Sequence, residues 1–308
     1  MHISNRGKLK IAALVLNLVL LIIGIIYLIP FIWMVLSSFK LNADVLSIPI
    51  KILPRTWNFQ SYPNALNYAG YNFPRYFFNS FVVLVFAVLL CLFLSATAGY
   101  GFAKYKFKKN KLLFVVVMST LMIPFEAIVI PLFLLITRLN LQDNYLALII
   151  PGGLTAFGVF LMRQFFYSIP DEIIEAARID GATEWQIFWR VSMPLAKTAV
   201  LSLAILHGQW VWNLLLWPLV VISKPDMRTL PQGISLFSGV YFTPYPEQLA
   251  ISVLACLPTL ILFIFLSRHF MAGVALTGLK MSGLNFLSRL GIRFKNFKFL
   301  TGGITYEK

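Results

Sequence analysis

The chain has 308 residues, of which 59% are hydrophobic and only 12% are charged. This balance is too apolar for a soluble domain of ordinary composition, so we expect the chain to lie in a membrane. Its formal charge of +15 comes from 26 basic and 11 acidic residues. In a soluble chain that excess would suggest nucleic acid, but the sequence has no basic, aromatic-interleaved domain of the kind that binds RNA or DNA. We expect contact with anionic lipid headgroups and none with nucleic acid.

Six apolar segments are long enough to cross a bilayer, which takes about 20 residues. They run over residues 11–36, 80–102, 112–136, 145–162, 198–222 and 249–267. The first has basic residues before it but no small-residue cleavage site after it, and its apolar run is too long for a signal peptide. We interpret it as a retained span. The sequence therefore predicts an all-α, polytopic membrane protein with six transmembrane helices.

Lysine and arginine indicate the orientation, because cytoplasmic loops are enriched in both. The amino-terminal residues 1–10 and the short loop 103–111 are rich in them, as is the tail after residue 267. Basic residues on the opposite side are more widely spaced. The sequence therefore predicts that both termini and the loop 163–197 lie in the cytoplasm.

The residue types that carry catalysis or bind metals are scattered along the chain. His2, His207 and His269 lie far apart in the sequence, and Cys91 and Cys256 fall inside spans, where we interpret them as packing residues. No catalytic motif is present, so we expect no catalytic residue, no metal site and no cofactor.

A glycine-containing stretch at residues 273–282 departs from the phosphate-binding loop. Leu279 separates its glycine from Lys280, and Met281 displaces Ser282. We expect that the chain does not bind ATP by itself.

The polar segment 171–194, between the fourth and fifth spans, carries an amphipathic pattern of its own. Apolar residues recur there at helical spacing, at Ile173, Ile174, Ala177, Trp185, Phe188 and Trp189. Gly181 predicts a break between two short helices, because glycine turns sharply without steric cost. Pro194 predicts the start of the next helix in a new direction. The alternative is a plain amphipathic linker helix.

This segment resembles the EAA loop of permeases from binding-protein-dependent ABC importers. Glu175, Ala176, Ala177, Gly181 and Pro194 stand in the positions of that motif. The richer pattern of the sugar-uptake, maltose-permease-like group is also matched, at Asp180, Gly181, Ala182 and Phe188. With the hydropathy pattern, the resemblance covers residues 11–283 as one transmembrane domain.

The resemblance implies a non-catalytic permease subunit in the bacterial inner membrane. Its EAA loop would form a coupling helix in a groove of an ATPase subunit, with Glu175 as the charged contact, Ala176 and Ala177 as a flat surface and Gly181 as the turn. Trp185 and Phe188 would anchor the second short helix. The implied partners are a second homologous permease, two ATP-binding subunits, an extracytoplasmic substrate-binding protein and a carbohydrate substrate.

Polar and aromatic residues inside spans are candidates for the substrate pathway, because burying them in lipid is costly. Glu126 lies between Pro124 and Pro131, which predict kinks in the third span. The fifth span offers His207, Gln209, Trp210, Trp212, Asn213 and Trp217. Indole faces and amides suit sugar rings, so we select Glu126, Gln209, Trp210 and Asn213 as candidates. Helix packing and anchoring at the membrane interface are the alternatives.

Two further segments each allow two interpretations. The aromatic-rich outer segment 40–76 suits either a docked binding protein or an interfacial aromatic belt. The basic, apolar-rich tail 284–308 suits either the inner leaflet or the ATPase pair.

Three other functions are alternatives to a carbohydrate permease. An importer for glycerol phosphate or a polyamine is the alternative within the same class. An ion-coupled secondary transporter would be expected to show paired intramembrane carboxylates or an inverted repeat, and neither is evident. A membrane-embedded enzyme would need a histidine or aspartate cluster at the end of a span.

Overall fold

The computed structural model describes residues 5–238 and 242–278, with side chains over 14–238 and 242–264. The described residues are helical, without strands, as expected from the sequence. The helices are α1 Asn5–Ser37, α2 Asn42–Val45, α3 Ser61–Leu66, α4 Phe73–Lys104, α5 Asn110–Ser119, α6 Phe125–Arg138, α7 Leu146–Gly152, α8 Ala156–Ser168, α9 Asp171–Ile179, α10 Glu184–Gln186, α11 Met193–Leu195, α12 Lys197–Trp212, α13 Leu216–Val221, α14 Leu230–Ser235 and α15 Tyr245–Gly278. Short 3₁₀ turns cover Tyr68–Gly70, Thr120–Met122 and Pro225–Met227, and a π-helical turn covers Ile187–Ser192.

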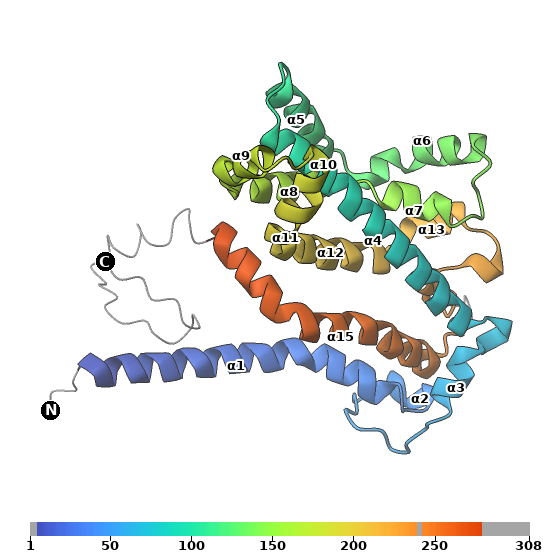
Figure 1. Cartoon of the computed structure of the whole chain (residues 1–308). Helices are drawn as coiled ribbons and strands as arrows, with labels where there is room; N and C mark the ends of the chain where they lie inside the picture. The colour runs from blue at the N-terminus through green and yellow to red at the C-terminus, as the bar shows by residue number, and fades with distance from the viewer. Residues whose placement is uncertain (1–4, 239–241, 279–308) are drawn as a thin grey trace.

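Helix α4 runs through the middle of the helical body and packs against α8, α12 and α7 (Figure 1). The α4–α8 crossing is close because a glycine stands at it. A Cβ atom on Gly99 would lie 2.7 Å from Cβ of Met162, so a larger residue at this position would push the two helices apart.

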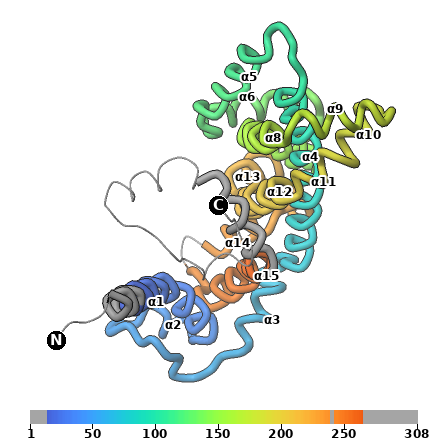
Figure 2. Tube along the Cα trace, turned by 60° about the vertical axis from the view of Figure 1, so that its left-hand side comes forward, coloured from blue at the N-terminus to red at the C-terminus, as the bar shows by residue number. Residues whose placement is uncertain are grey.

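Helix α1 lies at the edge of the body, beside α15 (Figure 1, Figure 2). None of the most apolar window of its Leu14–Ser37 portion is buried inside the chain. A long helix that is apolar all round and unburied is suited to lipid.

Three helical portions in the described part of the chain are long and apolar enough to span a membrane alone: Leu14–Ser37, Phe73–Lys104 and Tyr245–Ile264. Three bent pairs reach the same length together: Asn110–Met122 with Phe125–Arg138, Leu146–Gly152 with Ala156–Ser168, and Glu184–Leu195 with Lys197–Trp212. Their bends are 100°, 44° and 76°. The structure thus has several membrane-length apolar helices, while the count of six spans stays a prediction.

Several span boundaries differ from the sequence-based ones. Helix α4 begins seven residues before the expected position 80, because the Asn72 side chain accepts the Arg75 amide at 3.1 Å and Pro74 occupies the first turn. The third span, expected as one kinked helix over 112–136, breaks at Ile123–Pro124. The fifth, expected over 198–222, breaks after Trp212.

Asn79 and Ser80 lie inside α4 and hold the loop before α14. The Asn79 amide donates to the carbonyls of Asp226 and Arg228, each at 2.8 Å, and Ser80 Oγ accepts the Leu230 amide at 2.7 Å. The hydroxyl of Tyr145 donates to Asn79 Oδ1 at 2.6 Å. These bonds tie three separate segments together at the end of the body opposite α9.

Candidate functional site

Two short helices, α9 and α10, project from one end of the body as a knob (Figure 1). Helix α9 ends in a Schellman motif, in which the Gly181 amide donates to the Arg178 carbonyl and the Ala182 amide to the Ala177 carbonyl, both at 3.0 Å. Gly181 has φ +82°, a left-handed conformation that favours glycine. The predicted break between two short helices at Gly181 is therefore confirmed.

Helix α10 begins with a capping box. Thr183 Oγ1 accepts the Gln186 amide at 3.3 Å, and Gln186 Oε1 accepts the Thr183 amide at 2.9 Å. The pattern Thr183-Glu-Trp-Gln186 is the sequence signature of this cap, and it was not among the predicted features.

The knob is attached to the body through an apolar core. Ile174, Ile187 and Phe188 are buried, and Phe188 packs edge-on against Tyr100 of α4 at 5.2 Å between ring centroids. The knob therefore rests on α4 and α8, so that a displacement of one is felt by the others.

The outer face of the knob is exposed. Glu175, Ala176, Asp180 and Gly181 lie in solvent, while Ala177 and Ala182 are partly buried. Ile179 is 86% exposed, and the sequence analysis did not select it. Its position at the end of α9, two residues before Gly181, was the signal that could have identified it.

The aromatic residues of the knob divide in two. Phe188 is buried, as expected for an anchor. Trp185 is 58% exposed and stacks on Phe188 at 5.6 Å between centroids, so it covers the anchor from outside.

Polar contacts join the knob to the end of α4. Lys104 Nζ donates to Asp171 Oδ1 at 2.7 Å and to the Ile169 carbonyl at 2.5 Å. The Tyr105 hydroxyl donates to Glu184 Oε2 at 2.7 Å, and Arg178 Nε donates to Glu184 Oε1 at 2.6 Å. We call Tyr105, Arg178 and Glu184 the clasp.

The clasp shifts the pKa values of its members. Hydrogen bonds from Arg178 and then from Tyr105 lower the pKa of Glu184. Burial, followed by the hydrogen bond to Glu184, raises the pKa of Tyr105 to about 12. Tyr105 therefore stays a donor and Glu184 an ionised acceptor at neutral pH.

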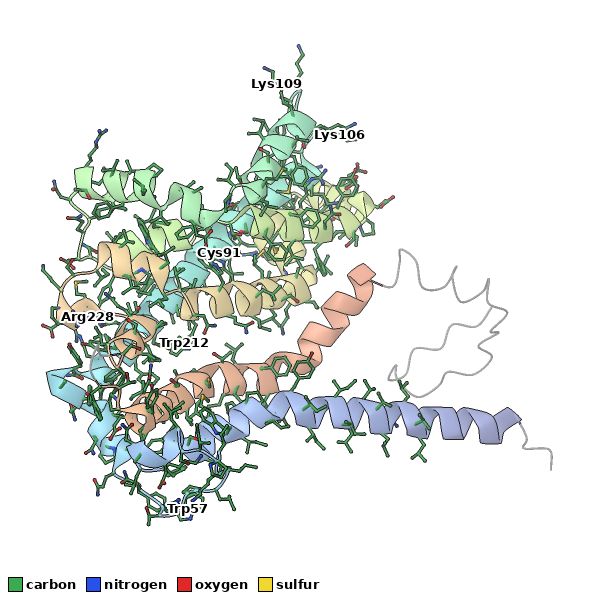
Figure 3. All side chains as sticks on the ribbon, turned by 180° about the vertical axis from the view of Figure 1, so that it is seen from behind. Trp57, Cys91, Lys106, Lys109, Trp212 and Arg228 are labelled. Atoms are coloured by element: carbon green, nitrogen blue, oxygen red, sulfur yellow. The ribbon has the colours of Figure 1, made fainter. Side chains whose placement is uncertain are left out.

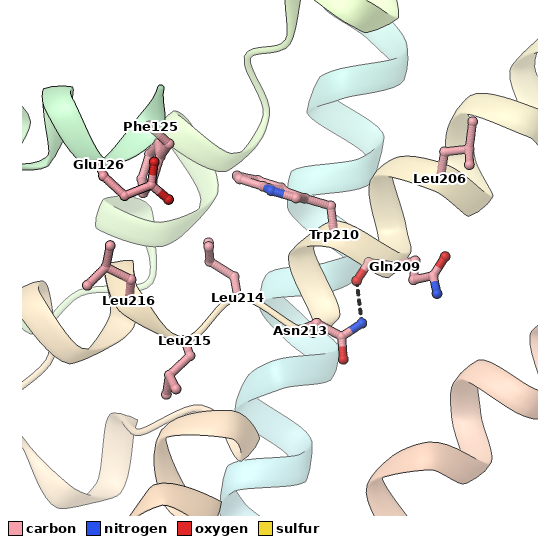
Figure 4. Close-up of a pocket in the computed structure, with 9 residues that line it drawn as sticks. All are labelled: Phe125, Glu126, Leu206, Gln209, Trp210, Asn213, Leu214, Leu215 and Leu216. Carbon is pink, nitrogen blue, oxygen red and sulfur yellow. Dashed lines mark hydrogen bonds between the residues drawn. The ribbon is translucent and has the colours of Figure 1, made fainter. Parts of the chain in front are cut away.

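The four pathway candidates line one open hollow of about 530 Å³, a size that suits a small ligand. Glu126 and Phe125 come from the first turn of α6, and Gln209, Trp210 and Asn213 from the end of α12. Figure 4 shows the Trp210 ring lying toward Phe125 and Glu126. Asn213 Nδ2 donates to the Gln209 carbonyl at 2.8 Å.

The other three fifth-span candidates are buried and already bonded. Trp212 Nε1 donates to the Ala255 carbonyl at 3.1 Å, and Trp217 Nε1 to the Ala147 carbonyl at 2.8 Å. His207 Nε2 lies 2.6 Å from the Gly152 carbonyl oxygen. These side chains hold α12 and α13 to neighbouring helices, whereas Gln209, Trp210 and Asn213 stay exposed.

Across the described residues, no group of three or more histidine, cysteine, aspartate or glutamate side chains lies close enough together to hold a metal ion. The expected tail 284–308 lies outside the described residues.

Residues 92–275 match the family described as binding-protein-dependent transport system inner membrane component. The arabinooligosaccharides transport system permease protein AraQ of Bacillus subtilis is 34% identical over 90% of this chain and 99% of its own length. The sn-glycerol-3-phosphate transport system permease protein UgpE of Pectobacterium atrosepticum is 32% identical over 88% and 98%. A chain in the crystal structure of a bacterial ABC transporter that imports the acidic polysaccharide alginate is 25% identical, with a TM-score of 0.74 over 88% of this chain and 99% of that one. The chain therefore belongs to the inner-membrane components of binding-protein-dependent transport systems, as a multi-pass permease subunit of the ABC type and not an enzyme.

Proposed function

We propose that the chain forms half of the translocation pathway for a carbohydrate and that its α9–α10 knob couples the pathway to ATP hydrolysis. The other half of the pathway comes from a second, homologous permease. Two ATP-binding subunits meet the knob in the cytoplasm, and a binding protein delivers the substrate on the other side. The bacterial inner membrane is the site of the complex.

The exposed face of the knob is the observation that carries the coupling role. This face of α9 offers an apolar contact at Ile179, a flat surface at Ala176 and a charge at Glu175. An isoleucine that is 86% exposed at the end of a short amphipathic helix suits burial in a partner's groove. Hydrogen bonds fix the turn between α9 and α10 on both sides, so the two helices can move together when a partner pushes on them.

A push on the knob has two routes into the body. The buried contacts of Ile174, Ile187 and Phe188 lead to α4 and α8, and the clasp leads to the end of α4. Closure of the ATPase pair would therefore tilt α4 and α8 together with the knob, as a rigid-body movement.

The basic loop beside the knob supports the cytoplasmic orientation. Lys106 and Lys109 protrude at the same end of the molecule (Figure 3). Basic residues concentrate on the cytoplasmic side of membrane proteins, which supports a cytoplasmic position for the knob, on the side where ATP-binding subunits act.

The lining of the hollow favours a neutral, hydroxyl-rich solute. Trp210 offers an indole face for the C–H side of a sugar ring, and Gln209 and Asn213 offer amides for hydroxyls. The charged residue among the nine that line it is Glu126. A phosphate ester facing a carboxylate would be repelled, so glycerol phosphate, the solute named for one relative, is the second candidate.

The test is purification of the tagged chain in mild detergent, followed by reconstitution of the complex in vesicles. We expect a second permease and an ATPase to co-elute, and ATP-driven uptake of a labelled oligosaccharide. Uptake of glycerol phosphate or a polyamine in place of the oligosaccharide would correct the substrate but keep the transport class. A chain that purifies without an ATPase and transports on an ion gradient would overturn the proposal.

A further inference from the structure

The connection between α1 and α4 divides into an inward-facing part and an outward-facing part. Next to the connection, Tyr76 in the first turn of α4 is buried, and within the connection Tyr68 stacks on Phe237 with ring centroids 4.8 Å apart. These tyrosines serve the core of the protein. Residues 46–59, which we call the outer loop, turn the other way.

Apolar side chains of the outer loop are exposed almost throughout. They are Leu46, Ile48, Ile50, Ile52, Leu53, Trp57 and Phe59. Ile48 is 96% exposed, which is close to full contact with the surroundings. A group of exposed apolar side chains within one short loop marks contact with a protein or a membrane.

The outer loop is held back against the last turns of α1. The Lys40 ammonium donates to the Lys51 carbonyl at 2.6 Å and also lies 5.7 Å from the centre of the Trp33 ring. The backbone N–H of Asn58 donates to the Phe39 carbonyl at 2.8 Å. The loop is therefore fixed beside Trp33, one turn before α1 ends.

Trp33 gives the depth of the loop in the membrane. The Leu14–Ser37 portion of α1 has 24 residues, which makes it about 36 Å long against a hydrocarbon core of about 30 Å. Its last turn therefore reaches the boundary between acyl chains and headgroups. Tryptophan is itself enriched at that boundary.

Neighbouring surface and charge both favour lipid as the occupant. The surface continues that of α1, whose apolar window is unburied by this chain, and Figure 3 shows Trp57 on the side of the molecule where α1 lies. The outer loop carries Lys51 and Arg55 and has no acidic residue in its own sequence. Arg55 Nε lies 3.7 Å from Oδ1 of Asp44, just before the loop, and its side chain is still 60% exposed. Basic residues among exposed apolar ones suit an anionic interface.

We propose that residues 46–59 form an interfacial anchor, with their apolar side chains in the upper acyl region of the bilayer and Lys51 and Arg55 at the lipid phosphates. The anchor fixes the outer end of α1, a helix that the rest of the chain packs weakly. This requires that α1 spans the membrane, and it does not depend on the transported solute or on the coupling role of the knob.

The test uses two variants that each carry one added cysteine, labelled with an environment-sensitive fluorophore. Ile50→Cys reports on the outer loop, and Asn64→Cys, on the exposed surface of α3, is the matched control. Wild-type chain, with Cys91 and Cys256 alone, gives the labelling background. The complex is placed in phosphatidylethanolamine–phosphatidylglycerol vesicles with and without lipids that carry a nitroxide high on the acyl chain.

We expect blue-shifted emission and strong nitroxide quenching for the label on Ile50→Cys, and weak quenching for the label on Asn64→Cys. Since Ile50 is exposed, its replacement leaves the fold intact, which normal elution of the labelled complex checks. If the label on Ile50→Cys instead shows the emission of a water-exposed fluorophore and is quenched by aqueous iodide but not by the nitroxide lipids, the proposal is wrong. The outer loop would then be a contact surface for a protein partner.

Discussion

The Tyr105 hydroxyl donates a 2.7 Å hydrogen bond to Glu184 across 79 positions of the sequence. Tyr105 directly follows α4, and Glu184 opens α10. Arg178, on α9, holds the same carboxylate. One carboxylate thus joins the central helix of the body to both short helices of the knob.

Removal of the clasp should weaken coupling more than folding. Its side chains are partly exposed, so each pair contributes roughly 1 kcal/mol or less to stability. We expect Tyr105→Phe and Glu184→Ala to leave membrane abundance near wild type and to lower the amount of solute transported per ATP hydrolysed. Tyr167→Phe, at an exposed tyrosine on α8, is the control. An unchanged ratio in both clasp variants would show that the core contacts alone transmit the push.

The clasp should not set the pH dependence of transport near neutrality. The pKa of Glu184 lies below its ordinary 4.5, so its stabilising contribution is present above that value and is lost only as the pH falls through the lowered pKa. The pKa of Tyr105 is raised to about 12, so its protonated form is kept well above neutral pH. Uptake by Tyr105→Phe, measured against pH, should be scaled down without a change of shape around neutrality. A shift of the pH optimum of uptake in Tyr105→Phe would contradict the prediction that the clasp does not set the pH dependence near neutrality.

Gly181 should tolerate asparagine better than valine. An L-residue in the left-handed region costs about 1–2 kcal/mol, asparagine visits it more readily, and a β-branched residue is a strong outlier there. A Cβ at Gly181 meets no neighbour within 4 Å, so the backbone alone decides the outcome. Uptake should fall in the order wild type, Gly181→Asn, Gly181→Val. Gly101→Ala, at a helical glycine with equally open surroundings, should transport normally. Equal uptake by the valine and asparagine variants would contradict the strained turn.

Gln209→Ala should raise the substrate concentration needed for half-maximal uptake. An amide that loses a ligand partner costs roughly 1–3 kcal/mol. Asn213→Ala also removes the bond to the Gln209 carbonyl, so its effect mixes binding with the end of α12. Binding-protein-stimulated uptake measured over a range of substrate concentrations separates a change in half-saturation from a change in maximal rate. If uptake is unchanged in both single variants and in the double variant, α12 packs in this subunit without touching the solute.

Local sequence signals predicted the knob well because its turn is encoded by single residues. Gly181 has the positive φ that a helix break requires, and the apolar spacing identified Ile174 and Phe188, which are buried. The contacts of Tyr105 with Glu184 and of Lys104 with Asp171 join distant segments, and no pattern within one helix encodes them. Their partners are known only once α4 and α9 lie side by side.

Hydropathy predicted which segments are apolar, and Pro124 predicted a kink where the third span bends, but neither predicted how sharp that bend is or that the fifth span breaks. The 100° bend at Ile123–Pro124 exceeds the kink expected from a proline, and the break after Trp212 carries no proline at all until Pro218. The sequence selected Trp210 from the three tryptophans of the fifth span, but composition gave no physical reason to set Trp212 and Trp217 aside. Burial distinguishes these tryptophans, because the buried Trp212 and Trp217 donate their indole N–H groups to backbone carbonyls of the chain.

The most direct test of the coupling role is co-purification of the ATPase with knob variants. Tagged wild-type chain, Glu175→Lys and Ile179→Glu would be purified in mild detergent, and ATP hydrolysis and subunit content measured in each eluate. Both substitutions lie on the exposed face of the knob, so we expect the fold to be unaffected. Glu175→Lys reverses a charge and Ile179→Glu adds one, and each change is unfavourable only where the knob is buried against the ATPase. The proposed role predicts that both variants retain the second permease, lose the ATPase and fall to background uptake. ATPase that co-elutes with both variants as it does with wild type, together with normal uptake, would contradict it.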